Sequence, residues 1–251
     1  MGVKFLTLNL RHNADRWPER RALVIDQLLA EQADVIALQE VRLEIRQAHD
    51  LADALNARLG EQPYRVALAP KWEPEPDEGV ALLSRPPIAE HERLELPGDG
   101  GRVAQRIRVE INGRAVDIAN THLHHRPYEN ESVRLPQVEH LLRWMFARGD
   151  GVARRWLLAG DFNATPESAT VQAVQARLHS AYPSVHGVEP VTFPSPLVAE
   201  PRPALTIDYI FFDPAHFRAT DARVTCNRPH PDDPALCPSD HFGLAAAFLV
   251  L

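Results

Sequence analysis

The stretch LLAGDFNATP, residues 157–166, places an acidic residue where a short apolar run ends. The run has the length and composition of a buried strand. Asp161 follows it directly, Asn163 comes two positions later, and Thr165-Pro166 are typical of a helix start. Ligand sites in α/β proteins form at the carboxyl ends of strands, so we predict that Asp161 and Asn163 belong to such a site.

Polar residues recur at the ends of other apolar runs along the chain. They are Asn9 after FLTL, Gln39 and Glu40 after VIAL, His122 after DIANT, Asp208 within TIDYIFF, and Asp240-His241 before the last apolar run. Any one of them could be an ordinary turn or cap residue. Their repetition favours one shared rim at which the strands end.

The order of the elements predicts an α/β fold with mixed sheets. We expect strands at residues 3–10, 35–38, 80–84, 103–111, 116–120, 156–159, 207–212 and 242–251, and helices near 22–29, 48–59, 138–146 and 165 onwards. Asn112-Gly113 favours a two-residue antiparallel hairpin, whereas the helical crossovers favour parallel pairs. No repeat or long linker divides the 251 residues, so we expect one domain over residues 1–251.

The composition narrows the class of protein. A formal net charge of -7 argues against a protein that holds duplex nucleic acid by bulk charge, although a bound metal would still admit a phosphate substrate. Cys226 and Cys237 are expected as free thiols, with a local disulfide as the alternative. Without a recognisable leader or an apolar run of ~18 residues, we expect a cytoplasmic monomer with no stable membrane association.

The polar set has the chemistry of a metal-dependent hydrolase. Carboxylates such as Glu40 and Asp240, with the amide oxygen of Asn9, are ligands that Mg²⁺ and Mn²⁺ prefer. Zinc would require a short-range Cys and His cluster, which the sequence lacks. Asp161 is suited to accept a proton from water, and His241 to donate to a phosphate.

Seven segments in order resemble the endonuclease/exonuclease/phosphatase superfamily, which includes DNase I, exonuclease III-type nucleases, inositol polyphosphate 5-phosphatases and neutral sphingomyelinases. The segments are TLNL, LQEV, GVALLSRPPI, NTHLH, AGDFNATP, TIDYIFF and SDHFG, and the resemblance covers residues 3 to about 248. It implies a four-layer α/β sandwich, in which two mixed β-sheets pack face to face with helices outside. It also implies a phosphoester hydrolase that depends on Mg²⁺ or Mn²⁺.

The resemblance assigns roles position by position. The implied metal residues are Asn9, Glu40, Asp161, Asn163, Asp240 and His241, and the implied catalytic residues are His122, Asp161, Asn163, Asp208 and His241. In this scheme Asp161 and Asn163 position the attacking water and the phosphate. Asp208 supports His241, and His122 acts near the leaving group.

Further candidates are weaker because arginines and acids on strands and loops are mostly solvated. Glu78, Arg102 and Arg106 are candidate substrate-binding residues, with Glu78 alternatively exposed in the acidic loop before its strand. Arg134 and Gln137 are expected to play supporting roles, and Trp17 with Arg20 to pack.

The substrate is left open by the sequence. A small phosphate ester or a nucleic-acid or nucleotide end is preferred, and a sphingomyelinase-like phospholipase C activity is the alternative. A catalytically inactive binding module of the same fold is a second alternative. A carboxylesterase is excluded because no G-x-S-x-G motif is present.

Overall fold

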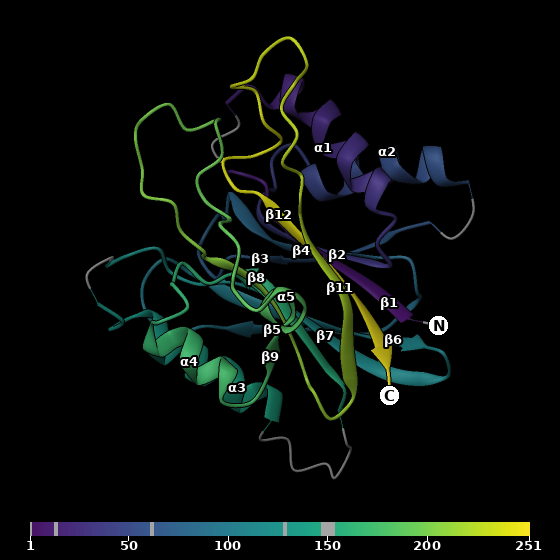
Figure 1. Cartoon of the computed structure of the whole chain (residues 1–251), viewed down its shortest axis with the longest axis vertical. Coiled ribbons are helices and arrows are strands. Elements are labelled where there is room, and N and C mark those ends of the chain that lie inside the picture. The colour runs from purple at the N-terminus through teal and green to yellow at the C-terminus, as the bar shows by residue number, and fades with distance from the viewer. Residues whose placement is uncertain (1, 13–14, 61–62, 128–129, 147–153) are drawn as a thin grey trace.

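Two six-stranded mixed β-sheets form the centre of the computed structural model, which describes residues 2–12, 15–60, 63–127, 130–146 and 154–251 (Figure 1). Sheet A has the order β11-β12-β1-β2-β4-β3 and sheet B the order β5-β6-β7-β8-β10-β9. Sheet A consists of β1 (Gly2–Asn9), β2 (Val35–Arg42), β3 (Arg65–Pro70), β4 (Glu78–Ser84), β11 (Phe217–Thr225) and β12 (Gly243–Val250). Sheet B consists of β5 (Ile88–Glu95), β6 (Val103–Ile111), β7 (Arg114–His122), β8 (Trp156–Asp161), β9 (His179–Ser180) and β10 (Asp208–Phe212).

Helices cover the outer face of each sheet, except the helix Ala181–His186, whose Ala181 belongs to the core between the sheets. The helices are α1 (Trp17–Glu31), α2 (Gln47–Leu59), α3 (Arg134–Phe146), α4 (Ala169–Gln175) and α5 (Ala181–His186). Side chains of α1 and α2 share one apolar cluster with sheet A, and those of α3 and α4 share another with sheet B. Figure 1 shows the two helix pairs on opposite sides of the sheets. The predicted four-layer sandwich is therefore confirmed.

Both faces of the central strands are buried, which explains their unbroken apolar runs. In β1, Phe5 faces the core between the two sheets, while Leu6 and Leu8 face α1 and α2. The same core contains Ile107 and Ile118 of sheet B, so the sheets pack directly against each other. No helix among the described residues is long and apolar enough to cross a membrane.

Strand direction brings the polar strand ends to one edge of the sandwich. β1 runs parallel to β2, and β7 runs parallel to β8. β10 is antiparallel to β8, so Asp208 lies opposite Asp161, and β12 is antiparallel to β1 and starts where β1 ends. The loops between α5 and β10 and between β11 and β12 project at the end away from the two chain termini (Figure 1).

The predicted hairpin is present at residues 111–114. Ile111 pairs with Arg114, and Asn112 and Gly113 have φ values of 54° and 74°, as the two central residues of a type I′ turn require. Strands β3, β5, β9 and β11 and the short helix α5 were not predicted. β3 and β11 are at sheet edges, as is β5, whose sequence IAEHERLE is largely exposed and polar.

Two local expectations need correction. The helix expected from Thr165-Pro166 begins only at Ala169, where the Ser168 side chain accepts a hydrogen bond from the amide of Val171. Glu78 does not belong to the exposed loop, because it opens β4 and is buried.

A buried amide bridge joins the two sheets just beneath the strand ends. Asn120 of β7 donates to the carbonyls of Leu38 and Ala81, both at 2.9 Å, and accepts from the Gln39 amide at 2.8 Å. Asn120 and Gln39 are fully buried, so each hydrogen bond replaces one that water can no longer provide. This bridge fixes the spacing of the sheets next to the polar edge.

We expect Asn120→Ala to lower the free energy of unfolding by about 2–4 kcal/mol, because it removes three hydrogen bonds between buried groups. Urea denaturation measures the change, and Asn130→Ala, at an exposed position, is the control. A loss below about 1 kcal/mol would show that the bridge does not hold the sheets together.

Candidate active site

Asp161 lies at the centre of the polar cluster at the end of the two sheets. Its Oδ2 accepts a hydrogen bond from Asn9 Nδ2 at 3.0 Å, and its Oδ1 accepts one from the amide of Asn163 at 2.8 Å. His122 Nε2 lies 3.5 Å and His241 Nε2 4.0 Å from Asp161 Oδ2. Burial, and next the negative charge of Asp208, raise the pKa of Asp161 to about 7. One carboxylate thus gathers residues from β1, β7, β8 and the segment before β12.

His241 is held by a buried carboxylate. Its Nδ1 and Asp208 Oδ2 are 2.9 Å apart, which fixes the ring and leaves Nε2 facing Asp161. Burial alone lowers the pKa of His241, but the charge and hydrogen bond of Asp208 raise it well above its ordinary value on balance. The raised pKa favours the imidazolium form, which can donate from Nε2.

His122 has the opposite electrostatic setting. Arg102 Nη1 lies 2.6 Å from His122 Nδ1, and because a guanidinium has only donors, Nδ1 must accept. Burial, and next the charge of Arg102, keep the pKa of His122 well below its ordinary value. The ring is therefore neutral with its hydrogen on Nε2, which faces Asp161 and lies 3.8 Å from Glu40 Oε1. In this tautomer His122 is a donor and not a metal ligand.

An irregularity in β2 positions Glu40. The register between β2 and β4 shifts between Leu38 and Val41, and Glu40 has a φ of 53°, which is rare for a residue with a side chain. Its Oε2 accepts from the amide of His12 at 2.7 Å, while Oε1 points toward His122. The bulge thus turns the carboxylate toward the cluster.

Asp240 and Asn9 are already engaged by protein groups. Arg11 Nη1 donates to Asp240 Oδ2 at 2.7 Å, and the Arg11 amide donates to Asn9 Oδ1 at 2.9 Å. Burial raises the pKa of Asp240, but the charges of His241 and Arg11 lower it on balance. The Arg11 guanidinium therefore occupies Asp240 Oδ2, for which a metal contact was predicted. The role of Asp240 as a metal ligand stays a prediction.

A divalent metal fits the remaining acidic groups. Ligand atoms of Glu40, His122 and Asp161 all lie within 4.8 Å of one another. Since His122 is a donor, Glu40 and Asp161 are the carboxylates that would hold the ion. The pKa of Asp161 is raised by burial, and a cation there would remove that penalty. Oxygen ligands suit Mg²⁺ or Mn²⁺.

The three weaker candidates occupy different places. Arg102 contacts His122 directly. Glu78 lies 3.7 Å from Arg102 Nη1 and also forms an ion pair with Lys71. The prediction that Arg106 binds substrate needs correction, because Arg106 lies on the outer side of sheet B. Its guanidinium donates there to Asp117 at 2.6 Å and to Glu90 at 2.8 Å. It contacts no other residue of the predicted site among the interactions that the structure describes.

Sequence reasoning missed Arg11, His12 and Lys71. Arg11 and His12 directly follow the TLNL segment, and their place after a strand end was the available signal. Gln137 accepts a hydrogen bond from the His124 amide, which fits the supporting role expected of it. Arg20 was expected only to pack with Trp17, but it also donates to the carbonyls of Leu10 and Pro238. Cys226 and Cys237 are buried free thiols, as favoured.

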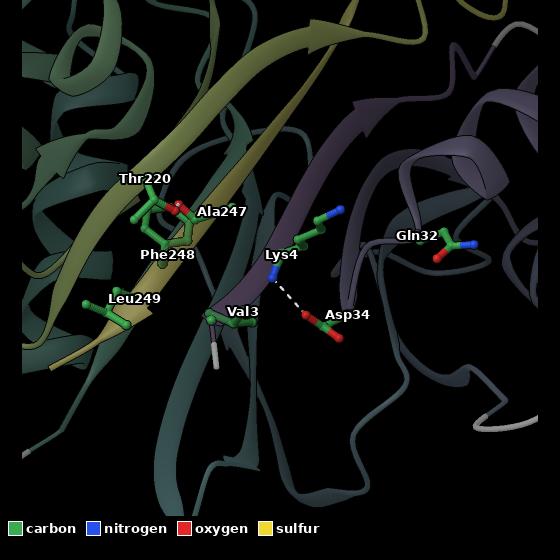
Figure 2. A pocket seen from close by; sticks show the side chains of 9 residues that line it. Val3, Lys4, Gln32, Asp34, Thr220, Ala247, Phe248 and Leu249 are labelled. Atoms are coloured by element: carbon green, nitrogen blue, oxygen red, sulfur yellow. Dashed lines mark hydrogen bonds between the residues drawn. The ribbon is translucent and has the colours of Figure 1, made fainter.

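A cavity of about 520 Å³ opens beside His241 and Asn163. Its other walls come from Arg11, Asp240 and the segment that leads into β10. A second hollow lies at the opposite end of sheet A, near the start of β1 (Figure 2). There the Lys4 amide donates to Asp34, and no member of the predicted site is among the described residues that line it.

The fold and the cluster define a four-layer α/β sandwich with an acid–histidine centre at one end of two mixed sheets. The chain belongs to the endonuclease/exonuclease/phosphatase family, whose model matches residues 6–241.

Individual relatives agree with this membership. YbhP, an uncharacterised protein of Escherichia coli K12, is 28% identical over 236 residues, which cover 87% of this chain and 88% of YbhP. Nocturnin of Drosophila melanogaster is 28% identical, and the match covers 94% of this chain but 42% of that protein. The human Nocturnin catalytic domain, solved with a bound sulfate anion, superposes with a TM-score of 0.77 at 24% identity. That match covers 100% of this chain and 95% of the other.

The pKa of Asp161 predicts a pH dependence of the metal-free protein. The carboxyl holds its proton more tightly when folded, because its pKa rises from 3.8 to about 7. Its contribution to stability is therefore present at low pH and is lost as the pH rises through 7. With EDTA present, we expect the melting temperature to fall more between pH 5 and pH 8 in the wild type than in Asp161→Asn. Asp53→Asn, at an exposed position, should keep the wild-type slope. Equal slopes for wild type and Asp161→Asn would contradict the assignment.

The Arg11–Asp240 pair predicts a measurable coupling. Both side chains are largely buried, so solvent screens their interaction only weakly, although Arg11 also pairs with Asp15 at 2.9 Å. In a double-mutant cycle of Arg11→Ala and Asp240→Ala, followed by urea unfolding, we expect a coupling of about 1–3 kcal/mol. The exposed pair Arg16–Asp233, at 2.8 Å, is the matched control and should give below about 1 kcal/mol. Additive effects for Arg11 and Asp240 would show that the two groups are energetically independent.

Proposed function

We propose that this protein is a Mg²⁺- or Mn²⁺-dependent hydrolase of small phosphate esters, acting as a phosphodiesterase or phosphatase. Family membership supports phosphoester hydrolysis as the general activity. The observation that carries the proposal is the convergence of Glu40, His122 and His241 around the buried carboxylate of Asp161. Carboxylates for a cation and two N–H donors at the same point match the needs of a phosphoryl centre.

Glu40 and Asp161 would hold the metal ion. When bound, it supplies positive charge that polarises a phosphoryl oxygen. His12 supports this arrangement by fixing one oxygen of Glu40 through its backbone amide. Asn9 does the same for Asp161 through its side-chain amide.

Asp161 and Asn163 would prepare the attacking water. Asn9 and the Asn163 amide both donate to the Asp161 carboxylate and orient it to accept a proton from that water. Asn163 has a φ of 48° and donates to the carbonyl of Leu123, which anchors its side chain beside the cavity. The water would lose its proton to Asp161 as its oxygen attacks phosphorus. The bond from phosphorus to the ester oxygen would break, and that oxygen would leave with the bonding electron pair and take up a proton from solvent.

The two histidines would stabilise charge from different sides. His241, kept protonated by Asp208, would donate to a non-bridging phosphate oxygen. His122, kept neutral by Arg102, would donate from Nε2 without adding a full charge, and this suits a position near the leaving group. A protonated His241 and a neutral His122 would therefore have different roles, one at a non-bridging oxygen and the other at the leaving group.

Charge supports a small substrate over a long nucleic acid. The chain has 34 acidic and 27 basic side chains, so phosphates far from the centre would meet a repulsive surface on average. We therefore propose a soluble phosphate ester or a nucleotide as the substrate.

Removing the metal or a central side chain should abolish turnover. With bis(4-nitrophenyl) phosphate and Mn²⁺, we expect Asp161→Ala and His241→Ala to lower kcat by at least about a thousandfold, because each removes a group that acts in the transition state. EDTA should have a comparable effect on the wild type. His179→Ala, at an exposed position on β9, is the control. Full activity in EDTA would rule out the proposed metal dependence.

A further inference from the structure

Helix α1 is bonded at three points to the long loop between β11 and β12, which ends with Asp240 and His241. Figure 1 shows α1 beside this loop. The bonds come from side chains of α1 and its N-cap: Gln27 with the backbone of residue 228, Arg16 with Asp233, and Arg20 with Pro238. Of these, the bond from Arg20 lies nearest in sequence to the site, and Arg20 has no exposed surface. Its role therefore extends beyond the packing that the sequence predicted.

The guanidinium of Arg20 joins the two segments that carry the Arg11–Asp240 ion pair. Its Nη1 donates to the carbonyl of Leu10 at 3.1 Å and to the carbonyl of Pro238 at 2.9 Å. Leu10 directly precedes Arg11, and Pro238 lies two residues before Asp240. One buried nitrogen thus holds the backbone on both sides of the ion pair.

Asp15 makes a second connection from Arg20 to Arg11. The Nε of Arg20 donates to the carbonyl of Asp15 at 2.9 Å. The Asp15 carboxylate accepts from Arg11 Nε at 2.9 and 3.1 Å, and Arg11 Nη1 donates to Asp240. Arg11 also has a φ of 60°, a conformation that a residue with a side chain keeps only when its surroundings hold it. The placement of Arg11 therefore depends on contacts that Arg20 makes outside the cluster.

A short series of hydrogen bonds leads from Pro238 to His241. The hydroxyl of Ser239 donates to Asp240 Oδ1 at 3.1 Å and accepts from the His241 amide at 3.3 Å. Ser239 is fully buried, and His241 is 5% exposed. Because these residues are consecutive and bonded to one another, a shift of the Pro238 carbonyl would move the His241 ring.

The contacts of Arg20 require a guanidinium. A buried cation is tolerated only when hydrogen bonds and a counter-charge compensate it, and Arg20 Nη2 lies 3.6 Å from Asp15 Oδ1. The guanidinium also lies 5.4 Å from the centre of the Trp17 ring, a favourable position for a cation. It directs donors in several fixed directions of one plane, whereas a lysine ammonium is a compact point charge. Lysine at this position could not hold all three carbonyls.

We propose that Arg20 is a positioning residue of the active site, which sets the places of Arg11 and His241 by holding the backbone next to each. The inference rests on the proposed function for the reaction that Arg20 affects. Among the interactions that the structure describes, Arg20 bonds to none of Glu40, His122 and Asp161, so it acts through other residues. The competing view is that Arg20 only stabilises the fold.

Steady-state kinetics distinguish the two views. Initial rates of Arg20→Lys are measured with bis(4-nitrophenyl) phosphate and Mn²⁺, at a temperature where circular dichroism shows the variant to be folded. We expect kcat to fall about tenfold to a hundredfold with KM within about threefold of the wild type, because a displaced His241 donates less well in the transition state. A residue that only stabilises the fold would lower the melting temperature and leave kcat of the folded enzyme unchanged.

Two variants of the same helix are matched controls. Gln27→Ala removes the two hydrogen bonds to residue 228, so it loosens the same loop far from Pro238. Arg21→Lys replaces the neighbouring arginine, whose ion pair with Asp50 lies outside the loop. We expect both to keep kcat within about twofold of the wild type. A loss in Gln27→Ala as large as that in Arg20→Lys would show that general loosening of the loop is the cause, and would overturn the inference.

Nuclear magnetic resonance tests the position of His241 without turnover. The imidazole nitrogen resonances are recorded with Mg²⁺ present and assigned by comparison with His241→Ala. In Arg20→Lys we expect the His241 resonances to move from their wild-type positions, because the ring changes its place relative to Asp208. The signals of His179, exposed on β9, should stay.

Hydrogen exchange of the wild type keeps the inference testable if Arg20→Lys does not fold. The amides of Arg11 and His241 lie in the two segments that Arg20 joins. We expect their protection factors to agree within about fivefold and to fall together as urea is added, because joined segments open as one unit. A larger difference, or a different dependence on urea, would show that the segments open independently and would overturn the inference.

The outcomes separate this inference from the proposed function. Either an unchanged kcat in folded Arg20→Lys or unchanged His241 resonances would overturn the positioning role. A wild type that hydrolyses no phosphate ester would contradict the proposed function, whereas displaced His241 resonances in Arg20→Lys would still support the positioning role of Arg20.

Discussion

The hydrogen bond from Asn9 to Asp161 is the contact on which the site depends, because it joins the end of a strand in sheet A to the end of a strand in sheet B. The Asp161 carboxylate is almost completely buried, and a buried charge is tolerated only when hydrogen bonds or a counter-charge compensate it. The donors come from both sheets, so the sheets must stay in one relative position. The Asn120–Gln39 bridge beneath provides that constraint with neutral groups.

The charge states of His241 and His122 follow from the side chain that contacts Nδ1 of each ring. Asp208 lies behind His241 and keeps it charged, whereas Arg102 lies behind His122 and keeps it neutral. Both rings then direct an N–H toward the same carboxylate. Glu78, buried behind Arg102 with Lys71, compensates the charge of the arginine. The site is therefore an arrangement of alternating charges in which no buried ion stands alone.

Arg11 and Asp240 form a further ion pair of the cluster, between the end of β1 and the segment before β12. Arg11 neutralises Asp240, and its backbone amide holds Asn9, so one residue organises both the end of β1 and the segment before β12. Arg20 ties the same two segments through the carbonyls of Leu10 and Pro238. Because the loop at residues 187–207 is bonded to that segment as well, the catalytic groups and the cavity wall form one connected structure.

The sequence by itself determined the central strands, the hairpin at Asn112-Gly113 and the identity of the strand-end residues. These features follow from local composition and spacing, which a single chain displays directly. Only the tertiary structure decided which atoms meet. Arg102 directly precedes β6 and Arg106 lies within it, four residues later, yet Arg102 reaches His122 whereas Arg106 pairs with Asp117 on the outer side. Likewise, Arg11 met Asp240 across 229 positions of sequence. Side-chain partners depend on strand register, sheet packing and edge strands such as β5 and β11, whose polar sequences carry little periodic signal.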